Sequence, residues 1–193
     1  NGDVIAKLTM DEDSYYLPYD EIPEYAIQAF VAVEDRTFWE NSGVDFKGIL
    51  RVGLRYLYTD GKEVHGASTI TQQLARNRFL TNEVSLERKA KEILIARELT
   101  KKYTKEQIME FYVNDISFAN TYYGLEAAAI GYFGKSSRDL SLSQIAYLCA
   151  IPNSPTYYNP YRHPENALAR RDKILNDTLE MGDITQEEHD QAI

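Results

Sequence analysis

The segment IPEYAIQAFVAVEDRTF, residues 22–38, is the clearest indicator of the fold. Its apolar side chains recur every three or four residues, which places them on one face of a helix. They are Ile22, Tyr25, Ala26, Ala29, Phe30 and Val33. Three charged residues, Glu34, Asp35 and Arg36, follow directly where this apolar stripe stops. The segment therefore predicts an amphipathic helix that ends in a cluster of charges.

Glu34 is the first candidate for a catalytic residue. The aromatic residues Phe38 and Trp39 follow it closely. A carboxylate that loses part of its hydration beside aromatic rings binds a proton more readily, as a general base must. A solvated helix end without any chemical role accounts for the same residues, and the local pattern leaves both interpretations open.

Outward from this segment the helical period continues. A second apolar stripe covers residues 46–58, with Lys47, Arg51 and Arg55 on the opposite face, and residues 85–102 form the longest helical run. Ser68 is expected to cap a helix over 69–78, and His163-Pro164 to open the helix that carries Arg170 and Arg171. Capping boxes predict three further helix starts, at Thr104, Ser141 and Thr185. Residues 3–19 alternate in part and predict an extended arm or a strand pair. The expected fold is mainly α, with about eight or nine helices and little sheet.

Glu92 is the second candidate. It shares an apolar helix face with Ile95, Ala96 and Leu99, and Arg88 and Lys89 precede it by one turn. One interpretation is a structural ion pair against the core. The other is a carboxylate that works with cations on an anionic ligand.

The third candidate is the run HGASTITQQLARN, residues 65–77. Small residues lead into hydroxyl and amide side chains at the start of a helix, where free backbone N–H groups favour anions. The run lacks the glycine spacing and the Gly-Lys pair of a nucleotide-binding P-loop. An ordinary polar helix cap is the alternative. A fourth stretch, from Glu110 to Asn114, either lines a sugar-binding cleft or simply packs as a helix with a polar end.

The net charge of −9 is distributed unevenly. Residues 1–24 carry seven acidic side chains against one lysine, and residues 176–193 carry six acidic side chains and no lysine or arginine. Residues 76–105 instead hold nine basic side chains against four acidic ones. An acidic periphery around a basic centre favours an anionic ligand of limited size, and no nucleic-acid partner is expected. The single cysteine and the three scattered histidines predict no metal site.

The 193 residues suit a single domain over 1–193. The longest uncharged apolar stretch, residues 145–152, is far too short to span a bilayer. The chain does not begin with Met, and we expect it to be a domain excised from a longer, bifunctional protein.

In their order along the chain, these stretches resemble the peptidoglycan glycosyltransferase domain, glycosyltransferase family 51, of class A penicillin-binding proteins and monofunctional transglycosylases. The resemblance covers about residues 20–180. The five family motifs match residues 34–45, 66–77, 88–99, 110–114 and 170–175. The chain departs from the family pattern at Asn41, in place of a histidine, at Ala67 and Arg76 in the second motif, and at Thr100.

The resemblance implies a lysozyme-like domain with a large globular lobe and a small membrane-facing jaw at about residues 44–62. It implies polymerisation of lipid II into β-1,4-linked glycan strands, with inversion and release of undecaprenyl diphosphate. Glu34 and Glu92 match the family's catalytic positions. The positions implied for substrate binding are Asp35, Ser68, Thr69, Gln72, Gln73, Arg76, Asn77, Arg88, Lys89 and Asn114.

The resemblance also implies partners and a location. The partners are lipid II, the growing lipid-linked glycan strand, the membrane surface through residues 44–58, and a C-terminal transpeptidase domain in the full-length protein. The implied location is the outer face of the bacterial cytoplasmic membrane, with an N-terminal transmembrane anchor absent from this chain. No cofactor is required, and Mg²⁺ or Mn²⁺ remains an option. The alternatives are a lysozyme-like enzyme that cleaves glycan strands and a non-catalytic cell-wall scaffold module.

Overall fold

The computed structural model describes residues 15–58, 68–80 and 85–193, apart from the side chains of 53–57. This part of the chain is mainly helical, which confirms the predicted fold class. Two short 3-10 helices, η1 (Tyr19–Glu21) and η2 (Ser137–Asp139), accompany the α-helices. The α-helices are α1 (Glu24–Glu34), α2 (Phe46–Tyr58), α3 (Ile70–Phe79), α4 (Leu86–Lys102), α5 (Lys105–Asp115), α6 (Leu125–Phe133), α7 (Leu142–Ala150), α8 (Pro164–Met181) and α9 (Gln186–Ala192).

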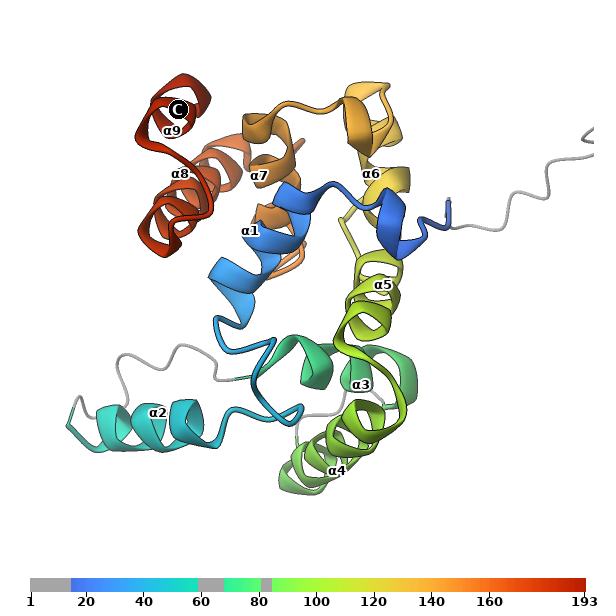
Figure 1. Cartoon of the computed structure of the whole chain (residues 1–193), viewed down its shortest axis with the longest axis vertical. Coiled ribbons are helices and arrows are strands. Elements are labelled where there is room, and N and C mark those ends of the chain that lie inside the picture. The colour runs from blue at the N-terminus through green and yellow to red at the C-terminus, as the bar shows by residue number, and fades with distance from the viewer. Residues whose placement is uncertain (1–14, 59–67, 81–84) are drawn as a thin grey trace, which may run out of the picture.

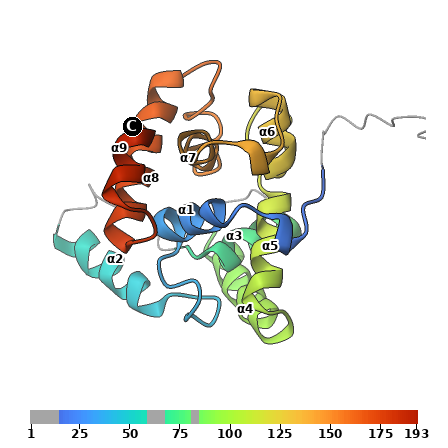
Figure 2. The same ribbon diagram turned by 45° about the horizontal axis from the view of Figure 1, so that its top comes forward.

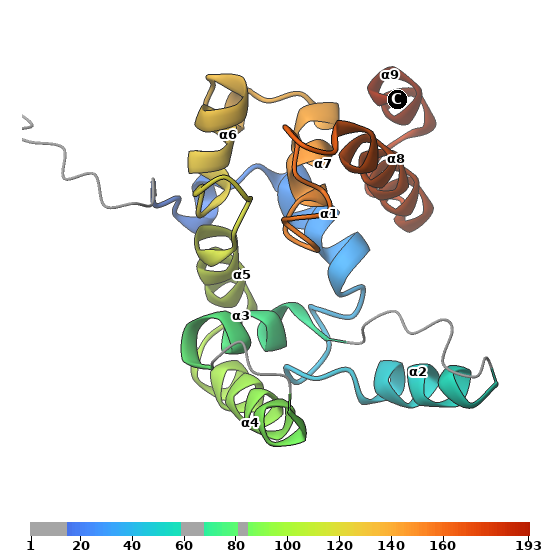
Figure 3. The same cartoon turned by 180° about the vertical axis from the view of Figure 1, so that it is seen from behind.

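The helices gather in two groups, as the two-lobed expectation requires. In Figure 1, α1 and α6 to α9 form the upper group, α2, α3 and α4 form the lower one, and α5 runs between them. Helix α1 packs against α7 and α8, while α3 packs against α4 and α5. Figures 2 and 3 show that α2 extends away from the other helices to one side. The end of α1 therefore lies at the junction of the two groups.

The main core lies where α1, α5 and the segment after α5 meet. The rings of Phe30, Tyr112 and Phe118 are fully buried there. Phe30 makes edge-to-face contacts with Tyr112 at 5.4 Å and with Phe118 at 6.5 Å between ring centroids, a favoured geometry for aromatic pairs. Cys149 on α7 belongs to the same core, and burial raises the pKa of its thiol, so this cysteine is unreactive.

A smaller apolar cluster of Val44, Ala75 and Ala96 joins the loop after α1 to α3 and α4. Gly43 precedes it with a φ of +88°, a conformation that favours glycine. A Cβ atom at this position would lie 2.5 Å from the backbone oxygen of Ala96. The loop can therefore approach α4 this closely only because residue 43 has no side chain.

Several predicted helix starts are confirmed. Thr104, Ser141 and Thr185 each form the expected capping box, and α8 begins at Pro164. The start of α3 was predicted one residue too early, because its cap is Thr69 rather than Ser68. The Thr69 hydroxyl accepts a hydrogen bond from the Gln72 backbone at 3.1 Å, and the Gln72 side chain accepts one from the Thr69 backbone.

The predicted extended arm over 3–19 lies mostly outside the described residues. Of its described end, residues 15–18 form neither helix nor strand and Tyr19 begins η1, so no strand pair is found there. The jaw expected at about 44–62 is described as far as residue 58, which is the end of α2. No helix in the described ranges is both long and apolar enough to cross a membrane.

Candidate active site

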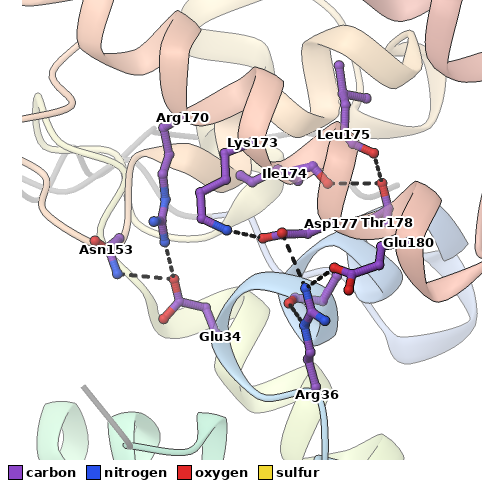
Figure 4. A network of polar contacts seen from close by, with 11 residues as sticks. Glu34, Arg36, Asn153, Arg170, Lys173, Ile174, Leu175, Asp177, Thr178 and Glu180 are labelled. Atoms are coloured by element: carbon purple, nitrogen blue, oxygen red, sulfur yellow. Dashed lines mark hydrogen bonds and ion pairs between the residues drawn. The ribbon is translucent and has the colours of Figure 1, made fainter. Parts of the chain in front are cut away.

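Glu34 is the last residue of α1, and its side chain is only 9% exposed. Its carboxylate accepts hydrogen bonds from three different parts of the chain. Gln73 Nε2 donates to Oε2 at 2.9 Å, while Asn153 Nδ2 and Arg170 Nη2 donate to Oε1 at 3.3 and 3.4 Å. Figure 4 shows the last two side chains converging on the same oxygen. The Glu34 carboxylate is therefore largely buried and fixed by hydrogen bonds, and it is not a solvated helix end.

The residue after Glu34 fixes the start of α3. Asp35 is buried, and its carboxylate accepts hydrogen bonds from the Ile70 backbone at 3.2 Å and from Thr37 at 3.1 Å. Burial raises the pKa of Asp35, and these hydrogen bonds partly oppose the shift. Asp35 therefore ties the end of α1 to the first turn of α3, rather than facing solvent with Glu34.

Asn41, the departure from the family pattern, takes part in this support. Its side-chain amide donates to both oxygens of Asp35, at 2.9 and 3.0 Å. Its oxygen accepts from the Gly43 backbone at 2.9 Å and from Lys105 Nζ at 3.2 Å. Lys105 also lies over the Phe38 ring, and burial lowers the pKa of Lys105. Asn41 therefore bridges a buried anion and a half-buried cation without carrying a charge itself.

Glu92 forms the second polar centre, on α4. Its side chain is only 1% exposed, so its carboxylate does not face solvent. It accepts hydrogen bonds from Gln72 Nε2 at 3.1 Å, from Arg88 Nη1 at 3.0 Å and from Lys89 Nζ. Lys89 also donates to the Ser68 hydroxyl at 2.8 Å. The buried carboxylate of Glu92 therefore holds two cations in place. The catalytic position that the resemblance implies for Glu92 stays a prediction.

The first turn of α3 joins the two centres. Gln72 binds Glu92, and the next residue, Gln73, binds Glu34. The orientation of the Gln73 amide is set in turn by Tyr112, whose hydroxyl donates to Gln73 Oε1 at 3.2 Å. Thr69 holds the same turn by donating to the Gly43 carbonyl at 2.7 Å. Two consecutive glutamines of α3 therefore contact the two carboxylates, Gln73 that of Glu34 and Gln72 that of Glu92, which holds Arg88 and Lys89.

Three further residues predicted to bind substrate, Arg76, Asn77 and Asn114, make none of the contacts described above with Glu34 or Glu92. Arg76 is half-buried one turn further along α3, and Asn77 is exposed. Asn114 holds the N-terminal segment instead, since its side chain bonds the backbone N–H and carbonyl of Leu17 at 2.7 and 2.8 Å. These hydrogen bonds tie the segment before η1 to α5, where Glu110 accepts from the Tyr19 backbone at 2.8 Å. The substrate-binding role of Asn114 stays a prediction.

Sequence reasoning missed two contacts of Glu34. Asn153 follows α7 in a loop without periodicity, so no local signal could single it out. Arg170 appeared only as one of a pair of arginines, and nothing local distinguishes it from Arg171. The difference comes from the helix: Arg170 faces Glu34, while Arg171 binds Asp172 and Ser143.

The donor set around these centres does not resemble a resident metal site. Within the described ranges, no group of three or more His, Cys, Asp or Glu side chains could hold a metal ion. Glu92 is surrounded by an arginine and a lysine, which would repel a divalent cation. The same arrangement suits a phosphate-bearing ligand, because two cations lie beside a serine hydroxyl.

Comparison with known proteins gives several related matches. The model of the transglycosylase family matches residues 1–179. The chain is 49% identical over 93% of its length to penicillin-binding protein 1A of Aquifex aeolicus. It is 40% identical over its full length to penicillin-binding protein 4 of Bacillus subtilis. The chain spans 24% and 31% of these two proteins.

A solved structure supports the fold. The crystal structure of penicillin-binding protein 1A from Haemophilus influenzae matches 94% of this chain and 17% of its own, with a TM-score of 0.57 and 22% identity. The family model covers nearly the whole chain, and the sequence relatives agree with it. The chain therefore belongs to the transglycosylase family.

Proposed function

We propose that this chain polymerises lipid II into β-1,4-linked glycan strands, with inversion at the anomeric carbon. The observation that carries the proposal is the turn of α3 that joins Glu34 to the cations held by Glu92. The reaction needs a base for the acceptor hydroxyl and positive charge for a departing diphosphate. One helix turn fixes the spacing of both.

Glu34 is the proposed base and takes the proton of the sugar 4-hydroxyl. As that O–H bond breaks, the oxygen forms a bond with the anomeric carbon of the growing chain. The bond from this carbon to the lipid diphosphate breaks at the same time, and its electron pair leaves with the diphosphate. A single displacement of this kind inverts the configuration, in keeping with an inverting hexosyltransferase.

Arg88 and Lys89 are the proposed partners of the diphosphate, with Arg76 one turn along α3. Glu92 holds the first two side chains in place and shields their mutual repulsion. Ser68 accepts from Lys89 and still has its own hydroxyl hydrogen to donate to a phosphate oxygen. Thr69, Gln72 and Gln73 lie at the start of α3 and support this arrangement through their hydrogen bonds to Gly43, Glu92 and Glu34. A divalent ion, which remains an option, would have to arrive with the diphosphate, and no step here depends on it.

The alternatives predict different products from the same assay. We expect the protein to convert purified lipid II into long strands and to release no fragments from preformed glycan, because the cation group has no use in strand cleavage. Gel separation of labelled products measures both activities. Release of short fragments from preformed strands would favour a lysozyme-like enzyme, and no change in either substrate would favour a scaffold module.

The membrane is the second proposed partner, through α2. Phe46 and Leu50 are 55% and 65% exposed, and Ile49 and Tyr58 are exposed as well. Lys47 and Arg51 are exposed on the same helix, with Arg51 near Asp45 at 3.8 Å. An exposed apolar face beside cations is typical of helices that lie in a membrane interface.

We expect the isolated domain to sediment with vesicles that contain anionic lipid at low salt, and to be released as salt rises. Each cation near an anionic surface contributes on the order of 1 kcal/mol, so a small group gives measurable, salt-sensitive binding. Replacing Lys47, Arg51 and Arg55 together with Glu should abolish sedimentation. It should also reduce turnover of full-length lipid II more than that of a short-chain analogue.

A matched variant separates this patch from net charge. Arg97, Lys101 and Lys102 are exposed on α4, and their replacement with Glu changes the charge equally. This control should still sediment. If both variants lost vesicle binding equally, the overall charge would determine that binding. If the α2 variant still bound vesicles, the membrane contact would belong to another surface.

The full-length protein is proposed to carry an N-terminal transmembrane anchor and a C-terminal transpeptidase domain. The greater length of the relatives and their naming as penicillin-binding proteins support this proposal. It places the domain at the outer face of the bacterial cytoplasmic membrane, where its lipid-linked substrate would be available.

A further inference from the structure

The two oxygens of Glu34 are not equivalent. Among the described residues, Oε1 accepts two hydrogen bonds, from Asn153 and Arg170, whereas Oε2 accepts one, from Gln73. A carboxylate oxygen has two lone pairs. Both lone pairs of Oε1 are therefore engaged, and Oε2 has one left for an incoming proton.

Arg170 is itself held in place. It lies on α8 with its side chain 14% exposed, and its guanidinium lies over the Tyr158 ring at 5.7 Å. Helix α8 is also bound to the residues after α1, because Arg36 donates to Asp177 at 3.2 Å and to Glu180 at 2.9 Å (Figure 4). The separation between Arg170 and Glu34 is thus fixed by a second set of contacts between the same two segments.

We infer that Arg170 is a positioning residue for the proposed reaction, acting through Glu34. With Asn153 it holds Oε1, so that Oε2 receives the proton of the acceptor hydroxyl. The inference rests on the proposed function and names the atom and the partner that the function alone leaves open.

Two substitutions test whether Arg170 orients Glu34. Arg170→Gln removes the guanidinium that holds Oε1, so kcat should fall by up to about 10²-fold. KM for lipid II should stay near that of the parent, because Arg170 acts through Glu34 and not on the substrate. Arg170→Lys keeps a donor at the same position, so it should restore part of the lost kcat. Asn153→Ala should also lower kcat and leave KM near that of the parent.

Arg171→Gln is the matched control. It makes the same change at the next position, where the side chain binds Asp172 and Ser143 instead of Glu34. This variant should keep the kcat and KM of the parent, and thermal unfolding should show all four variants folded. A parent-like kcat in Arg170→Gln, an equal loss of kcat in Arg170→Lys without any rescue, or loss of folding in both Arg170 variants would overturn the inference.

The same experiments keep this inference apart from the proposed function. If the parent does not polymerise lipid II, or if Glu34→Gln turns over normally, the proposed function or its base fails. If both of those tests succeed and the Arg170 variants behave like Arg171→Gln, only the role of Arg170 fails.

Discussion

Glu34→Gln should lower the rate of lipid II polymerisation at least about 10²-fold, because the amide cannot accept the proton of the acceptor hydroxyl. The shape of the side chain is retained, and its remaining oxygen can still accept from Asn153 and Arg170. The new NH₂ group meets the Gln73 amide, whose orientation Tyr112 fixes, so some local adjustment follows. The measurement is the initial rate with saturating lipid II, together with thermal unfolding.

Glu98→Gln is the matched control for this result. Glu98 on α4 pairs with Lys101 at 2.6 Å, and both side chains are exposed. The control should keep near-parent activity, since an exposed ion pair contributes little. Comparable rates in Glu34→Gln and Glu98→Gln would remove Glu34 from the mechanism.

Glu92→Ala is expected to lower both stability and activity. Three donors lose their shared acceptor, and the amide of Gln72 is left buried and unpaired. Removing one partner of a buried ion pair costs about 3–5 kcal/mol, and the lower end applies because Lys89 is partly exposed. Polymerisation should fall at least about tenfold, because Arg88 and Lys89 are no longer held for the diphosphate. Urea unfolding and initial rates measure the two effects.

A second variant and a control separate these effects. Glu92→Gln keeps the volume and some hydrogen bonds, so it should lose less stability than Glu92→Ala and still lose activity. Glu87→Gln changes a carboxylate one turn earlier on α4, where it forms an exposed pair with Lys91, and should change neither quantity much. If Glu92→Gln proved fully active, the charge of Glu92 would have no part in holding the cations.

The helices were predictable because their signals are local. A capping box lies within four residues, and an apolar stripe repeats within one turn, so Thr104, Ser141 and Thr185 marked their helices correctly. The start of α3 was predicted one residue early because Ser68 and Thr69 are both good caps. The capping box that Thr69 forms with Gln72 is a local signal that favours Thr69, and its contact with the carbonyl of Gly43, 26 residues away, reinforces it.

The sequence could single out candidate residues for the site but not the contacts between them. Glu34, Gln73 and Glu92 stand out by residue type, yet the pairing of Gln73 with Glu34 depends on how α3 is placed against α1. Arg170 reaches Glu34 across 136 residues of chain, a distance over which spacing carries no information. Asn41 shows the same limit: the sequence reveals a departure from a family pattern, and only the structure shows that its amide still holds Asp35.

The buried thiol of Cys149 has a practical consequence for the proposed membrane contact. It is the single cysteine of the chain, and it lies in the core with a raised pKa. A cysteine introduced at exposed Leu50 on α2 would then be the one accessible thiol, and an environment-sensitive fluorophore would attach there alone. The colour of its emission would report how deeply that helix enters a bilayer, without any change to the rest of the protein.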